Sequence, residues 1–198
     1  MTTDNPTIVE RLRSETRTQH DRLEEVAASD KLAEGTLSPE EYLKLLRANY
    51  AAHRQLEGLV GKSGEMEALL EERQKTRLLE KDLEQAGEDP ERVWQQLRNE
   101  LPDLALENKY QALGAQYVME GATLGGVVIL KSLNQHPQLQ PYQPFHYYGC
   151  YGGDTGRRWS QFKQLLLQEV QTPEQQEEAL KGTLGAYKLF EKAFVAVQ

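Results

Sequence analysis

Hydrophobic residues recur along most of this chain at the spacing of α-helices. In the first segment Val9, Leu12, Leu23 and Val26 follow a period near 3.6 residues, which predicts an amphipathic helix over residues 7–28. The alternating apolar and polar positions that are typical of β-strands are nearly absent. We therefore expect an all-α fold.

Helix start signals place further elements along the chain. Ser38-Pro39-Glu40-Glu41 is a capping box with proline at the first helical position, so we expect a second helix that runs to about Leu59. Thr172-Pro173-Glu174-Gln175 is a second capping box and starts the last helix. Between them we expect helices over 66–85, over a short stretch that Pro102 ends, over 106–134, and from Asp154 or Thr155 onward. Residues 135–154 form an irregular stretch.

Length and composition fit one globular domain. The chain has 198 residues, of which 38% are hydrophobic and 27% are charged, enough to bury a sizeable core. We find no repeat and no linker, so we expect a single domain over residues 1–198, with residues 1–6 flexible. A multi-helix bundle that is a monomer is the simplest expectation.

Charge and cysteine content exclude several classes of protein. Lys and Arg number 23 against 31 Asp and Glu, and the net charge of −8 argues against a nucleic-acid binder. No run approaches 18 apolar residues, and the start resembles no secretory signal, so we expect no membrane span. Cys150 is the single cysteine and cannot form an internal disulfide. A reducing, cytoplasmic location is therefore expected.

The histidines do not form a recognisable metal motif. His20, His53, His136 and His146 show no His-x-x-x-His spacing, and none follows a glutamate by three residues. A carboxylate-bridged di-iron site and a structural zinc site are therefore improbable. What remains is the possibility of an isolated histidine ligand.

His20 is the strongest candidate for such a ligand. It lies on the apolar face of the first predicted helix, with Glu24 one turn later and Arg13 two turns earlier. A lone helical imidazole that faces an apolar slot is what a five-coordinate haem requires, with a carboxylate to fix the tautomer. Arg13 could then reach a propionate. The same spacing also fits a core histidine beside two surface charges.

Glycines inside the long predicted helix need an explanation. Gly121, Gly125 and Gly126 each cost about 1 kcal/mol relative to alanine. Either another helix or a flat ligand comes close to the backbone there, or the helix bends. Spacing of small residues four apart is equally typical of helix packing. Tyr117, one turn before Gly121, offers a hydroxyl on roughly the same face.

Two further groups have simpler interpretations. Trp159 and Phe162 lie on an aromatic stripe that is typical of a helix facing the core, and Lys163 on the same helix is most simply a solvated charge. Cys150 is better interpreted as a small buried hydrophobe than as a ligand.

Four segments together resemble the heme oxygenases, particularly the soluble bacterial branch that produces biliverdin. They are Leu12 to His20, a Leu-basic-x-x-Thr-x-x-x-His run; Leu37 to Tyr42 with Tyr50 and Leu56-Glu57; Tyr117 to Gly126, the glycine-rich distal helix; and Thr155 to Lys163. They occur in the family's order and spacing, over residues 8–195. The resemblance implies an all-α bundle that holds haem between the first helix and a glycine-kinked distal helix.

The resemblance also implies roles for individual residues. His20 would be the axial ligand of the haem iron, oriented by Glu24, and Arg13, Tyr117 and Lys163 would bind the propionates. Gly121, Gly125 and Gly126 would let the distal helix lie close to the porphyrin and leave room for O2. The expected reaction opens haem, as both cofactor and substrate, to biliverdin, CO and ferrous iron. Its electrons would come from an external donor such as a ferredoxin or a reductase.

One departure from the family pattern concerns the supply of protons. Animal-type members carry an Asp after the first distal glycine and a Ser before the glycine pair, where this chain has Ala122 and Leu124. Ordered waters held by backbone and remote polar side chains would take over that Asp's part. Two other classes of function stay open: a haem-binding or haem-trafficking protein without turnover, and a haem-free helical protein that binds another small molecule.

Overall fold

The computed structural model describes residues 6–63, 66, 69 and 71–198, and this part of the chain contains helices and turns but no strand. The helices begin and end as follows: α1 Ile8–Glu15, α2 Arg17–Val26, α3 Ser29–Glu34, α4 Pro39–Lys62, α6 Thr76–Gln85, α7 Pro90–Leu97, α8 Lys109–Gln135, α9 Thr155–Glu169 and α10 Pro173–Ala196. Two short 3-10 helices, η1 Pro137–Tyr142 and η2 Gly152–Asp154, lie in the connection between α8 and α9. The all-α expectation is confirmed.

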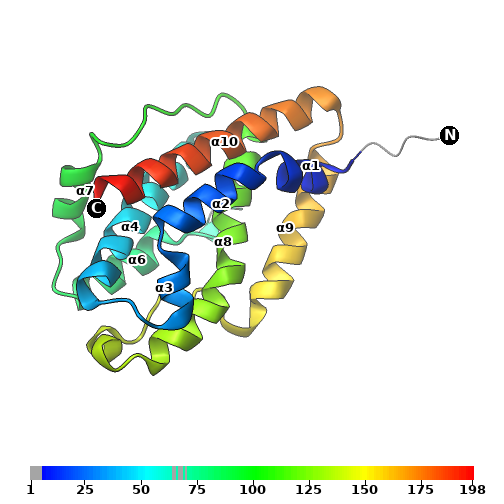
Figure 1. The fold of residues 1–198 in the computed structure, drawn as a ribbon. Coiled ribbons are helices and arrows are strands. Elements are labelled where there is room, and N and C mark those ends of the chain that lie inside the picture. Colours follow the sequence, from blue (N-terminus) through cyan, green and yellow to red (C-terminus); the bar gives the residue numbers. More distant parts are fainter. Residues whose placement is uncertain (1–5, 64–65, 67–68, 70) are drawn as a thin grey trace.

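Helix α8 forms the centre of the bundle (Figure 1). It packs against α10, α4 and α9, while α2 lies along α10. Two glycines allow the closest of these approaches. A Cβ atom on Gly114 of α8 would overlap the carbonyl of Ala179, and one on Gly182 of α10 would overlap the carbonyl of Gln111. The α8–α10 crossing therefore depends on backbones that touch without side chains between them.

The first predicted helix, 7–28, is interrupted, so this expectation is wrong in detail. The chain forms α1 and α2, which meet at Thr16, and α3 follows after Ala28, whose φ of +49° is left-handed. The buried Thr16 hydroxyl donates to the Leu12 carbonyl at 2.7 Å, a back-bond that bends helices. The bend lets α1 lie against α9 while α2 follows α10.

The third predicted helix, 66–85, is interrupted at residues 72–75, since residues 69 and 71 are helical as well as 76–85. Helix α6 begins at Thr76, and residues 72–75 form turns and irregular backbone. Arg73 and Lys75 are buried in this segment and pair with Glu120 of α8. Burying both cations requires the chain to leave the helix. Residues 67, 68 and 70 of that prediction, and residues 1–5 of the predicted flexible start, lie outside the described residues.

The other helix boundaries follow local capping. The predicted boxes at Ser38 and Thr172 are both present, with backbone and side-chain bonds in each direction. Helix α8 starts at Lys109 and not at residue 106, because the Asn108 side chain accepts from the N–H groups of Tyr110 and Gln111. From there α8 is one continuous helix through its glycines.

Helix α8 is also the one described helix that is long and apolar enough to cross a membrane. An 18-residue window in it reaches a mean hydropathy of 1.3, although it contains no unbroken apolar run of that length. Of this window, 44% is buried inside the fold. The central helix of a bundle has the same composition for the same reason, since it faces core on several sides.

Candidate functional site

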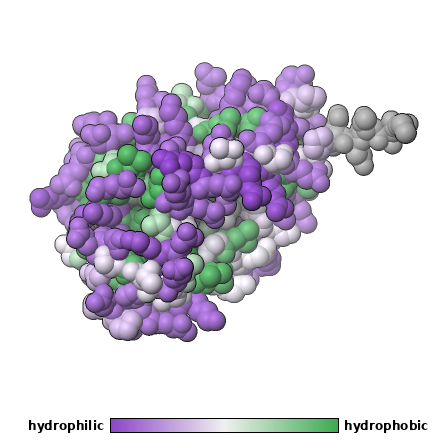
Figure 2. Space-filling model, in the orientation of Figure 1, coloured by the Kyte–Doolittle hydropathy of each residue, from purple (hydrophilic) through white to green (hydrophobic). Residues whose placement is uncertain are grey.

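A cleft of about 580 Å³ opens between α1 and α2 on one side and α8 and α9 on the other. Figure 2 shows apolar groups gathered in the hollow below α2, framed by hydrophilic residues. Its volume lies within the range of sites for small molecules and cofactors. Helix α10 contributes one side chain. The lining residues are Val9, Arg13, His20, Leu23, Glu24, Tyr117, Val118, Gly121, Ala122, Leu124, Gly125, Trp159, Lys163 and Tyr187.

His20 enters the cleft from α2. Its side chain is 54% exposed, so it is not a core histidine. Nδ1 lies 3.6 Å from Glu24 Oε2 and from Asp21 Oδ1, and the Tyr187 ring stands edge-on with centroids 6.5 Å apart. A proton on Nδ1, held toward these carboxylates, leaves the lone pair on Nε2. Nε2 is therefore the atom that can bind a metal ion.

Potential metal ligands also gather at this point. Within the described part of the chain, His20, Asp21 and Glu24 offer ligand atoms that lie within 4.8 Å of one another. All three side chains are exposed, and Nδ1 is the histidine atom that faces the carboxylates. This arrangement fits carboxylates that orient the imidazole.

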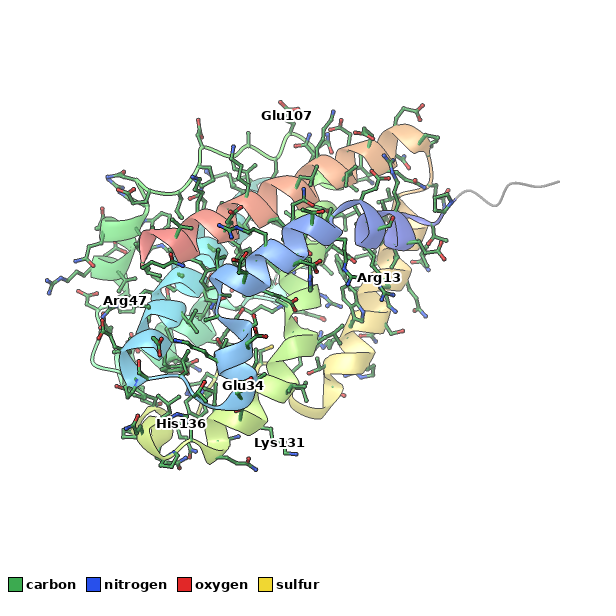
Figure 3. All side chains as sticks on the ribbon, in the orientation of Figure 1. Arg13, Glu34, Arg47, Glu107, Lys131 and His136 are labelled. Atoms are coloured by element: carbon green, nitrogen blue, oxygen red, sulfur yellow. The ribbon has the colours of Figure 1, made fainter. Side chains whose placement is uncertain are left out.

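The fixed positive charges that line the cleft come from opposite walls. Arg13 belongs to α1, where Figure 3 shows it beside α9, and Lys163 belongs to α9, with Nζ 5.8 Å from the Trp159 ring centre. Tyr117 presents a phenol whose pKa is raised by burial, an effect that the Arg13 charge opposes. Burial also raises the pKa of Tyr187 to about 12. These phenols are neutral donors, and the two cations suit anionic groups on a ligand.

Where α8 borders the cleft, its glycines have no side chains that would project into the cleft. Nothing lies within 4 Å of a Cβ atom built on Gly125, and one on Gly121 would meet Trp159 at 3.8 Å. Packing of another helix therefore does not explain Gly125. Gly126 differs, since it faces the Tyr148 carbonyl, 3.4 Å from its Cβ position, and does not line the cleft.

A smaller chamber of about 120 Å³ lies behind Ala122 and shares Leu23 and Val118 with the cleft. Its lining is apolar except near Asn49 and Tyr147. The Tyr147 hydroxyl donates to Asn49 Oδ1 at 3.1 Å and lies 3.2 Å from Nε2 of the buried His53. Burial lowers the pKa of His53, so its ring is neutral.

Seven of the eight site residues predicted from the sequence line this one cleft: Arg13, His20, Glu24, Tyr117, Gly121, Gly125 and Lys163. Sequence reasoning missed Trp159 and Tyr187. Trp159 is half-buried and reaches the cleft, although its stripe was expected to be core, as Phe162 is. Nothing in the sequence distinguishes Tyr187 from the other aromatic residues. Cys150 is half-buried in a loop and does not line the cleft.

Comparisons with known proteins agree with this geometry. A family model described as heme oxygenase matches residues 7–196. In fold the chain is similar to a heme oxygenase from Neisseria meningitidis whose structures were solved with NO and CO bound. The TM-score is 0.70 at 21% sequence identity, over 98% of this chain and 92% of that one. Comparison with curated proteins gave no match. With the family model spanning almost the whole chain, this protein belongs to the heme oxygenase family.

Proposed function

We propose that this protein is a haem-degrading oxygenase that uses O2 and electrons from an external donor, such as a ferredoxin or a reductase, to open haem to biliverdin. One observation carries the proposal. Four helices bring complementary groups to one cleft. Helix α2 supplies a histidine with a carboxylate beside Nδ1, α1 and α9 each supply a cation, and α8 supplies an edge of glycines. This set suits an iron porphyrin with its two propionates.

The residues present fit that group. His20 Nε2 would hold the iron, and Glu24, beside Nδ1, would orient the imidazole ring. Arg13, Lys163 and the Tyr117 hydroxyl would hold the propionates by charge-assisted hydrogen bonds. Because Arg13 and Lys163 stand on different helices, they would fix the rotation of the ring in its plane and so select the edge that is opened.

In the same cleft as His20, the backbone of α8 would border the bound haem and leave room for O2. Gly121 and Gly125 give that space, and Leu23 and Val118 keep the surroundings apolar. When bound, haem supplies both the iron that activates O2 and the ring that is opened, with release of CO and ferrous iron. The protein's contribution is orientation and the exclusion of bulk water.

Proton supply in this protein would run through the chamber behind Ala122. Ala122 leaves a small side chain between the cleft and that chamber, where Asn49 and Tyr147 are hydrogen-bonded to each other. Water held there by these two groups would take the part that the Asp has in animal-type members. We also propose that the reaction takes place in the cytoplasm, because the single cysteine fits a reducing compartment. A monomer is the simplest state for a chain with a net charge of −8.

Absorbance spectroscopy tests the proposal. Titration of the apo protein with haemin should give a Soret band at one equivalent. Reductant and air should then remove that band, with the absorbance of biliverdin appearing. A stable Soret band under turnover conditions would assign the protein to haem binding or trafficking. No Soret band would assign the cleft to another small molecule.

A further inference from the structure

A cluster of buried charges lies behind the cleft, at the point where α8 and α9 come together. Glu120 of α8 is fully buried and precedes Gly121, which lines the cleft. Its carboxylate accepts from Arg73 Nη1 and Lys75 Nζ, and from the Tyr151 hydroxyl at 2.9 Å. Side chains as polar as these are rarely buried without being paired, and here each is.

Arg73 extends this cluster to α9. Both of its terminal nitrogens lie 3.4 Å from the carbonyl oxygen of Arg158, and its guanidinium stands 5.6 Å from the centre of the buried Phe162 ring. One side chain therefore contacts a carboxylate on α8 and both backbone and ring on α9. The planar fork of arginine can satisfy these partners at once, which a lysine ammonium cannot do with the same geometry.

The residues next to these contacts form the two walls of the cleft. On α8, Gly121 follows Glu120. On α9, Trp159 follows Arg158, and its ring lies 5.3 Å from the Tyr117 ring and 3.8 Å from the Cβ position of Gly121. A change in the Glu120–Arg73–Arg158 connection would therefore move one wall relative to the other.

We propose that Glu120 and Arg73 are positioning residues that set the spacing between the α8 and α9 walls, and thereby the fit of a flat ligand in the cleft. This also accounts for the irregular backbone of residues 72–75, which brings Arg73 and Lys75 inward where the sequence pattern predicts a helix. The effect on the ligand rests on the proposed function. The wall spacing does not.

The spacing can be measured in the apo protein by pulsed electron spin resonance. Spin labels are attached at Val128→Cys on α8 and Gln161→Cys on α9, two exposed positions, in a Cys150→Ala background. The test variant is Arg73→Lys, which keeps the charge and loses the fork. Its matched control is Glu88→Gln, which breaks another ion pair, Arg47–Glu88, between α4 and the turn from α6 to α7, away from the cleft.

We expect Arg73→Lys to broaden or shift the α8–α9 distance distribution and to weaken haemin binding by roughly tenfold, the scale of one hydrogen bond to a charged group. Glu88→Gln should lower the melting temperature and change neither quantity. If Arg73→Lys does not fold, the double variant Arg73→Gln with Glu120→Gln replaces it, because that pair removes one buried charge of each sign.

A folded variant with wild-type distances and wild-type haemin affinity would overturn the proposal and leave the cluster with a purely stabilising role. If the wild-type protein itself binds no haemin, the proposed function fails, while the distance distributions still decide whether Arg73 and Glu120 set the walls.

Discussion

Among single residues, His20 is the one expected to bind the haem iron. His20→Ala should fold, because the side chain is half exposed and packs little against the core. It should lose the nitrogen ligand of the iron and with it turnover. Resonance Raman spectra of the ferrous haem complex should lose the iron–histidine stretch.

His136→Ala is the matched control for this variant. His136 is the C-cap of α8 and does not line the cleft, and Figure 3 shows it far from the cleft residue Arg13, so its loss should leave the spectrum unchanged. Turnover in His20→Ala at the wild-type rate, with His53 or His146 as the ligand, would show that His20 is not the axial residue.

Arg13 and Lys163 are also expected to act as single residues, each binding a propionate through its positive charge. Removing either should weaken haem binding by roughly 1 to 3 kcal/mol, the range of a hydrogen bond to a charged group, or change the mixture of biliverdin isomers. Haemin titration and product chromatography measure these two effects. Arg157→Ala is the control, because Arg157 lies on α9, pairs with Asp154 and does not line the cleft. If both variants behave like this control, the two residues are ordinary surface charges.

At the scale of elements, the glycines of α8 fall into two classes. Gly114→Ala should destabilise the protein by about 3 kcal/mol or more, because the new methyl group overlaps the backbone of α10. Gly125→Ala should stabilise it by up to about 1 kcal/mol, because the position is open and alanine is the better helix former. Urea unfolding of the two apo proteins tests this contrast. Equal losses in both would mean that Gly125 is also a packing position.

Gly125→Leu tests whether Gly125 serves helix packing or leaves space for a ligand in the cleft. The variant should keep the helix, His20 ligation and the Soret band. It should bind CO poorly and fail to open the ring, because the leucine side chain fills the space left for O2. CO titration and single-turnover spectra on one preparation test this. Normal CO affinity and a normal yield of biliverdin would place the O2-binding face elsewhere.

At the scale of the whole molecule, Asp82 connects α6 to the loop between α8 and α9. Its two carboxylate oxygens accept from the backbone N–H groups of His146 and Tyr147, each at 2.8 Å. Burial nonetheless raises the pKa of Asp82 from 3.8 to about 6. Between these values the folded state binds more protons than the unfolded state, so the Asp82 contribution to stability falls as the pH rises from about 4 to 6.

The expected loss is at most about 3 kcal/mol, from 1.36 kcal/mol for each unit of pKa. Asp82→Asn should remove this pH dependence, so the difference in unfolding free energy between wild type and variant should shrink from pH 4 to pH 6. Urea titrations at several pH values measure it. Asp103→Asn, at an exposed position, should follow the wild-type curve. A constant difference between wild type and Asp82→Asn would contradict the raised pKa.

The class of fold follows from local patterns in the sequence, because helical periodicity and capping act within a few residues. The boxes at Ser38 and Thr172 form as predicted, and α8 begins within three residues of its expected start. The sequence also marked His20 and Gly125, since a polar residue on an apolar stripe and a glycine inside a helix each carry a local cost. These costs can be recognised without knowing what lies opposite in the fold.

Tertiary structure alone decided where buried charges and long-range contacts go. Residues 72–75 lie in a segment whose local pattern predicts a helix, yet Arg73 and Lys75 are buried against Glu120, forty-five residues or more away in the chain. Thr16 breaks the first helix because α1 and α2 follow different partners. Gly126 and Gly125 are neighbours in sequence, but one faces a loop and the other faces the cleft. Each of these positions depends on residues far away in the chain, and no local pattern records those contacts.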